Sequence, residues 1–281
     1  MQVPNSSGTA RPHLQAPPNA CDCHMHIYDG ERFPAPRPQA RMQPNARLQD
    51  YRLLQQRIGT SRVVIVNPAA YVTDNEVTLD AIARIGPQAR GIAVVHPSVT
   101  DAELRRLADG GIRGIRFTQF DPNSASTTID MIEPLAERVQ ALGWHVQIHL
   151  RADQIVTNAD MLQRLPGTIV FDHLGRLTPP EGLDHPAFGI IRRMLDRGRT
   201  WMKLSGAYMF GAPPYAEATK VAQAYVAAAP ERMVWGSDWP HPTEKDKPDD
   251  AVLFDLLSQW APDEATRRRI LVDNPAQLYG F

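Results

Sequence analysis

The sequence has very little cysteine, almost no net charge and no long hydrophobic run. Its only cysteines are Cys21 and Cys23, and a disulfide across so short a loop would be strained. Because reduced thiols are typical of cytoplasmic proteins, we expect the chain in the cytoplasm. No apolar run approaches the roughly 20 residues of a membrane span. A formal net charge of −1 offers no basic field for nucleic acid or an anionic membrane surface.

These absences leave a small molecule as the expected partner, and the sequence leaves open whether the chain forms a homo-oligomer. Residues 1–19 are rich in Pro, Ser, Asn and Gly and lack the apolar core of a signal peptide, so we expect a flexible or wrapping arm. The long Pro-rich loop at 33–38 could cover a site, lie at an interface, or do neither.

Residues 20–281 alternate between short apolar runs and helical patterns, with no linker to divide them. Such alternation predicts a parallel sheet covered on both faces, and eight units in one chain predict a single-domain α/β fold, the (β/α)8 TIM barrel. No G-x-G-x-x-G motif follows any run, which argues against a dinucleotide-binding sheet. The runs predicted as strands are 20–26, 63–66, 91–95, 114–117, 145–148, 168–171, 201–204 and 233–235.

Polar side chains gather where these predicted strands end. His24 and His26 end the first strand, and residues two apart on a strand point to the same face. In a (β/α)8 barrel all strand ends meet at the rim that carries the active site. The side chains predicted at this rim are His24, His26, Asn67, His96, Arg116, His149, Asp172, His173, Lys203, Ser205 and Asp238.

Three motifs in this order resemble the lactonase branch of the amidohydrolase superfamily. This branch includes pyrone-dicarboxylate lactonases, sulfomuconolactone hydrolases and galactarolactone isomerases. The resemblance runs from about residue 20 to the C-terminus. The motifs are Asp22-x-His24-x-His26, Asp172-His173-Leu174-Gly175, and Gly236-Ser237-Asp238-Trp239-Pro240 followed by Asn274-Pro275-Ala276.

The resemblance implies a hydrolase that opens the lactone ring of a carboxylated compound, either a sugar-acid lactone or a muconolactone- or pyrone-type intermediate. It assigns Asp238 as the general base that deprotonates water, with His24, His26 and His173 as further catalytic residues. The apolar neighbours Trp235 and Trp239 predict a raised pKa for Asp238. The same resemblance implies three alternatives, a metal-dependent decarboxylase, a metal-dependent hydratase or a lactone isomerase.

Four residues are predicted to contact the substrate. Arg116 occupies the position of a carboxylate-binding arginine on the fourth strand, although an ion pair with Asp172 or Asp238 inside the barrel is the alternative. Two further arginines of the pyrone-dicarboxylate enzymes are absent, so the sequence leaves specificity for that particular dicarboxylate open. The other three predicted contacts are His149, Tyr208 and His241, the last as a proton shuttle.

The sequence leaves the cofactor open between none and one divalent metal ion. His24, His26 and Asp238 offer nitrogen and oxygen ligands for zinc or manganese. The two imidazoles could instead polarise the lactone carbonyl directly. The fourth strand has no lysine or glutamate to bridge two ions, so a binuclear site is not expected.

Overall fold

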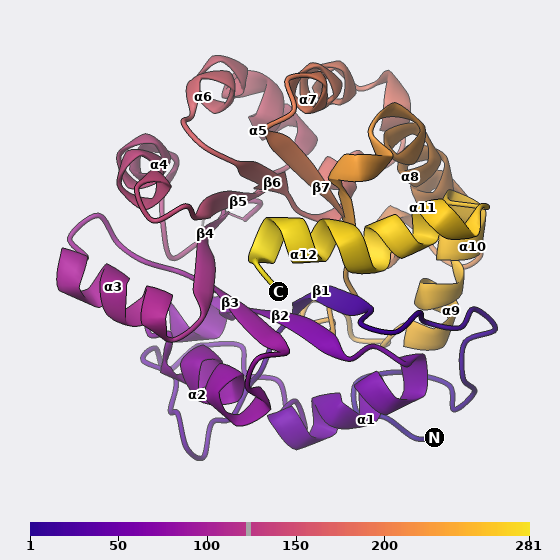
Figure 1. The fold of residues 1–281 in the computed structure, drawn as a ribbon, viewed down its shortest axis with the longest axis horizontal. Helices are drawn as coiled ribbons and strands as arrows, with labels where there is room; N and C mark the ends of the chain where they lie inside the picture. Colours follow the sequence, from indigo (N-terminus) through magenta and orange to yellow (C-terminus); the bar gives the residue numbers. More distant parts are fainter. Residues whose placement is uncertain (122–124) are drawn as a thin grey trace.

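The computed structural model describes residues 1–121 and 125–281, and these residues form a barrel of eight parallel strands. Each strand pairs with its neighbours in sequence, in the order β1 to β8. In Figure 1 the helices surround the strands, and the C-terminal helix crosses the middle of the barrel. The predicted single-domain (β/α)8 barrel is confirmed.

The strands are short and almost entirely buried. They are β1 (Cys21–Met25), β2 (Arg62–Val66), β3 (Ala89–Ala93), β4 (Ile112–Thr118), β5 (His145–His149), β6 (Ile169–Phe171), β7 (Thr200–Leu204) and β8 (Met233–Trp235). The α-helices are α1 (Leu48–Ile58), α2 (Glu76–Ile85), α3 (Asp101–Asp109), α4 (Ile132–Gln140), α5 (Ala152–Thr157), α6 (Ala159–Arg164), α7 (Pro186–Asp196), α8 (Ala216–Ala228), α9 (Asp250–Asp255), α10 (Leu257–Trp260), α11 (Glu264–Arg268) and α12 (Asn274–Tyr279). The short helical turns are η1 (Ala69–Tyr71), η2 (Ile129–Met131), η3 (His173–Arg176), η4 (Gly182–Asp184), η5 (Ala207–Phe210), η6 (Pro230–Arg232) and the π-turn η7 (Arg269–Asp273). Within the described residues, no helix combines the length and the apolar character needed to cross a membrane.

The helical stretch that follows β5 is divided into α5 and α6. Asn158 interrupts it between α5 and α6 with φ −105° and ψ 17°. Its side-chain amide donates to the carbonyl oxygen of Gln154 at 2.8 Å. A short polar side chain that bonds to nearby backbone competes with the helical hydrogen bonds, which explains the break.

The two ends of the barrel differ, because the C-terminal helix covers only one of them. The larger hydrophobic core lies between the strands and the surrounding helices, and a smaller cluster that includes Cys21, Cys23 and Val234 fills the interior. Tyr279 of α12 belongs to this inner cluster and packs edge-on against His145 at the start of β5. The C-terminal helix therefore covers the N-terminal ends of the strands, and the opposite rim remains for a site.

The sheet closes between β1 and the segment that follows β8. The backbone N–H of Asp238 donates to the carbonyl oxygen of His24 at 2.7 Å, and that of His26 donates to Trp239 at 2.8 Å. A Cβ on Gly236 would lie 2.6 Å from the Cβ of His24, so only glycine permits this approach. Closure of the barrel thus places Asp238 directly beside β1.

The N-terminal residues lie along the barrel wall. Val3 is fully buried, and Arg57 of α1 donates through Nε to the carbonyl oxygen of Ala10 at 2.7 Å. The backbone N–H groups of His13 and Leu14 donate to the carboxylate of Asp255 on α9. This segment is in contact with both the first and the ninth helix.

His145 makes the stability of the fold depend on pH. It is buried, and its Nε2 has no hydrogen-bond partner among the described residues. Burial lowers the pKa of His145 to about 3, whereas an unfolded histidine titrates near about 6.5. Between these values only the unfolded chain takes up the proton, so stability is lost as the pH falls from about 6.5 toward 3.

We therefore expect His145→Gln to lose less stability on acidification than the wild type, by about 2 kcal/mol between pH 7 and pH 5. Glutamine remains polar but takes up no proton in this range. Urea unfolding at both pH values measures the difference. Equal losses in the two proteins would contradict the assignment.

Candidate active site

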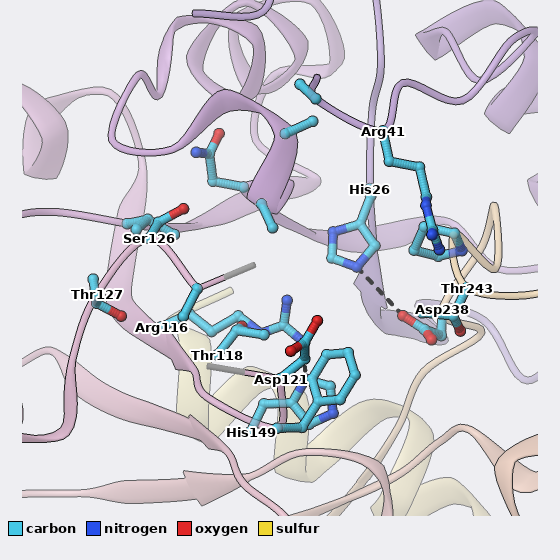
Figure 2. A pocket seen from close by; sticks show the side chains of 18 of the residues that line it. His26, Arg41, Arg116, Thr118, Asp121, Ser126, Thr127, His149, Asp238 and Thr243 are labelled. Atoms are coloured by element: carbon cyan, nitrogen blue, oxygen red, sulfur yellow. Dashed lines mark hydrogen bonds and ion pairs between the residues drawn. The ribbon is translucent and has the colours of Figure 1, made fainter. Parts of the chain in front are cut away.

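A cavity of about 570 Å³ opens at the C-terminal ends of the strands. This size is suited to a small-molecule ligand. Figure 2 shows the side chains of His26, Arg116, His149 and Asp238 in this cavity, with an interaction between His26 and Asp238. Each of the eight strands contributes lining residues from its end or from the loop after it, namely His26, Asn67, Val94, Thr118, His149, His173, Met209 and Asp238.

Three imidazoles converge on one oxygen of Asp238. The Oδ1 atom lies 3.3 Å from Nε2 of His26, 3.5 Å from Nε2 of His24 and 4.0 Å from Nε2 of His173. The other carboxylate oxygen accepts a hydrogen bond from the hydroxyl of Tyr208. All of the histidines are buried, so this cluster is shielded from bulk water except through the cavity.

The local backbone explains why these groups meet. The register of β1 against β2 shifts between Asp22 and Met25. Asp22 faces Tyr51 of α1, whose hydroxyl donates to it at 3.1 Å, while His24 faces the barrel interior. In a regular strand, Asp22 and His24 would point to the same face of the sheet. The shift in register turns the carboxylate of Asp22 away from the site and leaves His24 in it.

A similar departure occurs after β6. Strand alternation predicts that Asp172 and His173 point to opposite faces, but the strand ends at Phe171 and His173 has φ 50°. Both side chains therefore reach the site region. His173 Nδ1 lies 3.0 Å from the hydroxyl of Ser205, which orients the ring toward Asp238.

The prediction of a raised pKa for Asp238 is wrong. Burial does disfavour the charged carboxylate, but His173, His26 and His24 outweigh this cost and hold the pKa of Asp238 well below its usual range. The neighbours in sequence are turned away, since Trp235 packs against Phe254. Asp238 is therefore ionised at neutral pH and able to accept a proton.

Two of the imidazoles around it, those of His24 and His173, have lowered pKa values. Burial lowers the pKa of His173 to about 4, and burial together with Lys203 lowers the pKa of His24 well below its ordinary value. Near pH 7 the ionised Asp238 thus lies beside the neutral rings of His24 and His173, which can donate or accept hydrogen bonds without adding charge.

A buried ion network lies beneath the cavity. Asp172 accepts from Nε of Arg116 at 2.9 Å and from the amide of Gln147 at 3.0 Å, and Lys203 lies 3.7 Å away. Burial opposes ionisation of Asp172, but His24, Arg116 and Lys203 hold its pKa well below its usual range. Burial lowers the pKa of Lys203 to about 8, so its ammonium is still charged at neutral pH.

Arg116 forms the ion pair with Asp172 that the sequence offered as an alternative, and it also lies at the cavity. Its Nε pairs with Asp172, and its side chain also lines the cavity. Its Nη2 approaches Nδ1 of His149 at 3.1 Å. The Asp172 pair holds the guanidinium plane in place, which leaves other N–H groups to face a ligand.

The remaining predicted contacts occupy different positions. His149 lines the cavity and stacks on Phe120. Tyr208 lies behind Asp238 and bonds to it, and His241 packs edge-on against Tyr208 with its Nε2 3.2 Å from Asp250. Neither Tyr208 nor His241 is among the described residues that line the cavity. His96 is exposed and bonds to Ser98 instead.

The sequence reasoning missed three arginines that line the cavity. Arg176 is the last residue of η3, the turn after β6. Its Nη1 lies 3.0 Å from Nε2 of His149, and its guanidinium lies over the ring of Phe120. Arg37 and Arg41 come from the loop between β1 and α1, so the Pro-rich loop borders the site. In the sequence, the only indication of these cavity residues is the excess of arginine in the loops, and these arginines have no regular spacing.

The donor set of His24, His26 and Asp238 fits one divalent metal ion. Nδ1 of His26 donates to the carbonyl oxygen of Val66 at 2.8 Å, which leaves the lone pair of Nε2 directed at the carboxylate. The lone pair of His26 Nε2 and the carboxylate oxygen of Asp238 repel each other unless a proton or a cation lies between them. The 3.3 and 3.5 Å separations match the spacing of about 3.3 Å between tetrahedral zinc ligands.

The tautomer of His24 decides whether it can join this set. Its Nδ1 lies 3.3 Å from Oδ1 of Asp172 and 3.2 Å from Nζ of Lys203. Donation to Asp172 leaves Nε2 free as a metal ligand, whereas acceptance from Lys203 places a proton on Nε2. Nε2 has no hydrogen-bond partner among the described atoms.

Fold and site together define an amidohydrolase. The profile of that family matches residues 21–281, and the chain belongs to the family. It is 35% identical over 272 residues to a 4-sulfomuconolactone hydrolase of Rhizobium radiobacter, covering 94% of this chain and 91% of the relative. It is 32% identical over 280 residues to a D-galactarolactone isomerase of Agrobacterium fabrum, covering 97% of this chain and 94% of the relative.

A solved structure extends the comparison. The crystal structure of a probable 2-pyrone-4,6-dicarboxylic acid hydrolase from Acinetobacter baumannii, with citric acid bound, is similar with a TM-score of 0.80 at 28% identity. The match covers 94% of this chain and all of that chain. The predicted resemblance to the lactonase branch is confirmed.

Proposed function

We propose that this amidohydrolase hydrolyses the lactone ring of a small carboxylated compound. The observation that carries the proposal is the ionised Asp238 at the wall of a cavity that His26, His173 and Arg116 also line. An ionised carboxylate, the neutral imidazole of His173 and a guanidinium are groups suited to water attack on an anionic ester. The lactonase and isomerase relatives support the same substrate class.

In the proposed reaction, Asp238 takes a proton from a water molecule as its oxygen bonds to the lactone carbonyl carbon. The carbonyl becomes a tetrahedral oxyanion, which the imidazole of His173 stabilises through an N–H group directed into the cavity. Collapse of this species breaks the bond to the ring oxygen. The proton on Asp238 passes to that oxygen, which gives an open-chain hydroxy acid and returns the carboxylate.

Arg116 holds the carboxylate that the substrate carries besides the ring. Its Nε is committed to Asp172, so Nη1 and the free edge of Nη2 are the groups available to an acid. This contact orients the ring so that its carbonyl faces Asp238. Tyr208 donates to the second carboxylate oxygen and directs Oδ1 toward the reacting water.

His24, His26 and Asp238 would hold one divalent ion, zinc or manganese, in this proposal. A bound ion supplies a Lewis acid that polarises the ester carbonyl. The chain's own part is to present two imidazole nitrogens and one carboxylate oxygen, with Val66 fixing the orientation of His26. The free, buried thiols of Cys21 and Cys23 support a cytoplasmic location.

Asp238→Asn should abolish turnover while the fold persists. The amide cannot accept a proton at neutral pH, so we expect kcat to fall by at least about a hundredfold. A panel of lactones with a pH indicator measures the activity, and circular dichroism checks the fold. Asp246→Asn changes an exposed carboxylate on the same loop and should leave kcat within about twofold. Near-normal turnover of Asp238→Asn would contradict the assignment of the base.

Metal analysis tests the ligand set separately from activity. We expect the purified protein to hold about one equivalent of zinc or manganese and His26→Asn to lose it, because one of three ligands is then removed. His96→Asn, which changes an exposed histidine, is the matched control and should retain the metal. Active protein that contains no metal and resists chelators would show that the imidazoles act on the carbonyl directly.

A further inference from the structure

We propose that residues 3–8 of the N-terminal segment are a positioning element of the active site. They lie between the two loops that carry Asp238 and the arginines of the cavity rim, and they bond to both. The inference rests on the proposed function, because the activity it concerns is that of Asp238. It assigns a role in catalysis to a stretch that lies outside the barrel itself.

The first set of contacts reaches the loop between β8 and α9. The indole N–H of Trp239, the residue after the base, donates to the carbonyl oxygen of Pro4 at 2.8 Å. The backbone N–H of Ser7 donates to Pro248 at 3.0 Å. The hydroxyl of Ser6 accepts from the backbone N–H of Asp250 at 3.2 Å.

Asp250 extends this set back toward the base. Its carboxylate lies 3.2 Å from Nε2 of His241, whose ring packs edge-on against Tyr208. Tyr208 in turn donates its hydroxyl to Asp238. A continuous series of contacts therefore connects Ser6 with the carboxylate of the base, and every side chain after Ser6 in the series is shielded from solvent or half-buried.

The second set of contacts reaches the loop between β1 and α1. The side-chain amide of Asn5 donates to the carbonyl oxygens of Pro44 and Asn45, both at 2.9 Å. The same loop places Arg37 and Arg41 at the cavity. One short segment thus determines where the base loop and the arginine-bearing loop lie.

The base loop needs such support because its backbone is strained. Asp238 has φ 63° and His241 has φ 54°, in the left-handed region that side chains with a Cβ rarely adopt. Each such residue costs on the order of 1–3 kcal/mol and persists only where its surroundings hold it. Trp239 is fully buried between them, and its indole is anchored by Pro4.

The segment is also fixed to the barrel through α1. Val3 is fully buried, and the guanidinium of Arg57 is buried beneath the segment. Arg57 donates to Ser6 Oγ at 3.2 Å and to the carbonyl oxygen of Ser7 at 3.0 Å, and it pairs with Asp249. The segment can therefore transmit the position of α1 to both loops.

Three variants separate positioning from general stabilisation. Trp239→Phe removes the indole N–H but keeps an aromatic ring, and Asn5→Ala removes two hydrogen bonds to the other loop. Asp255→Ala is the matched control, since it removes two hydrogen bonds to residues 13 and 14 without touching either loop. Each variant is assayed on the lactone that the wild type opens, well below its Tm.

We expect Trp239→Phe to lower kcat by about tenfold with little change in KM, because the base is misplaced after substrate binds. Asn5→Ala should raise KM by about fivefold and leave kcat within about twofold, because the arginine-bearing loop contacts the substrate. Asp255→Ala should change neither. If the segment only stabilised the fold, all three variants would have a lower Tm. In that case kcat would not fall specifically in Trp239→Phe, and KM would not rise specifically in Asn5→Ala.

Hydrogen–deuterium exchange of the same variants keeps the result independent of the assay. Amides of residues 236–243 should exchange faster in Trp239→Phe than in Asp255→Ala, and those of residues 37–45 faster in Asn5→Ala. If Trp239→Phe does not fold, Ser6→Ala takes its place under the same criteria. Kinetics and exchange equal to those of Asp255→Ala would overturn the proposal. A wild type that opens no lactone would refute the proposed function, while the exchange comparison would still decide the role of the segment.

Discussion

The hydrogen bond from the backbone of Asp238 to the carbonyl of His24 is the contact on which the site depends. It closes the barrel, and the two residues that it joins are the proposed base and a member of the imidazole cluster. Asp22 reinforces the same junction, since its carboxylate accepts from the backbone and the hydroxyl of Ser237. Closure of the sheet and assembly of the site are therefore one event. A barrel that failed to close there would lose its base and its histidines together.

The second constraint is electrostatic. Asp172 lies under the cavity with Arg116 and Lys203 as its charged partners, and buried charges are tolerated only when they are paired and hydrogen-bonded. This network holds Arg116 at the cavity and places His24 between a carboxylate and an ammonium group. The protonation of His24 Nδ1 thus connects the ion network with the chemistry at Asp238. In the proposed function, the same imidazole would serve a bound metal ion or an unassisted reaction, according to which nitrogen holds the proton.

The fold and most of the rim could be predicted from the sequence, because apolar runs and helical periodicity are local signals and strand ends in a barrel share one rim. His24, His26, His149 and Asp238 follow from that reasoning. The pKa of Asp238 could not be predicted, because Trp235 and Trp239 are neighbours in the chain but not around the carboxylate. Arg41 and Arg176 lie in loops without periodicity, so only tertiary packing determines that they reach the cavity. The role of Asn5 in joining two loops is likewise a property of the folded chain.

The central claim is that Asp238 delivers water to a lactone carbonyl, and oxygen-18 water tests it most directly. A single turnover in labelled water, followed by mass spectrometry, reports whether solvent oxygen enters the product. Hydrolysis of the ring ester predicts one labelled oxygen in the newly formed carboxylate. A lactone isomerisation moves the acyl group within the molecule and needs no water in the product. A product without the label would therefore contradict the account and favour the isomerase chemistry.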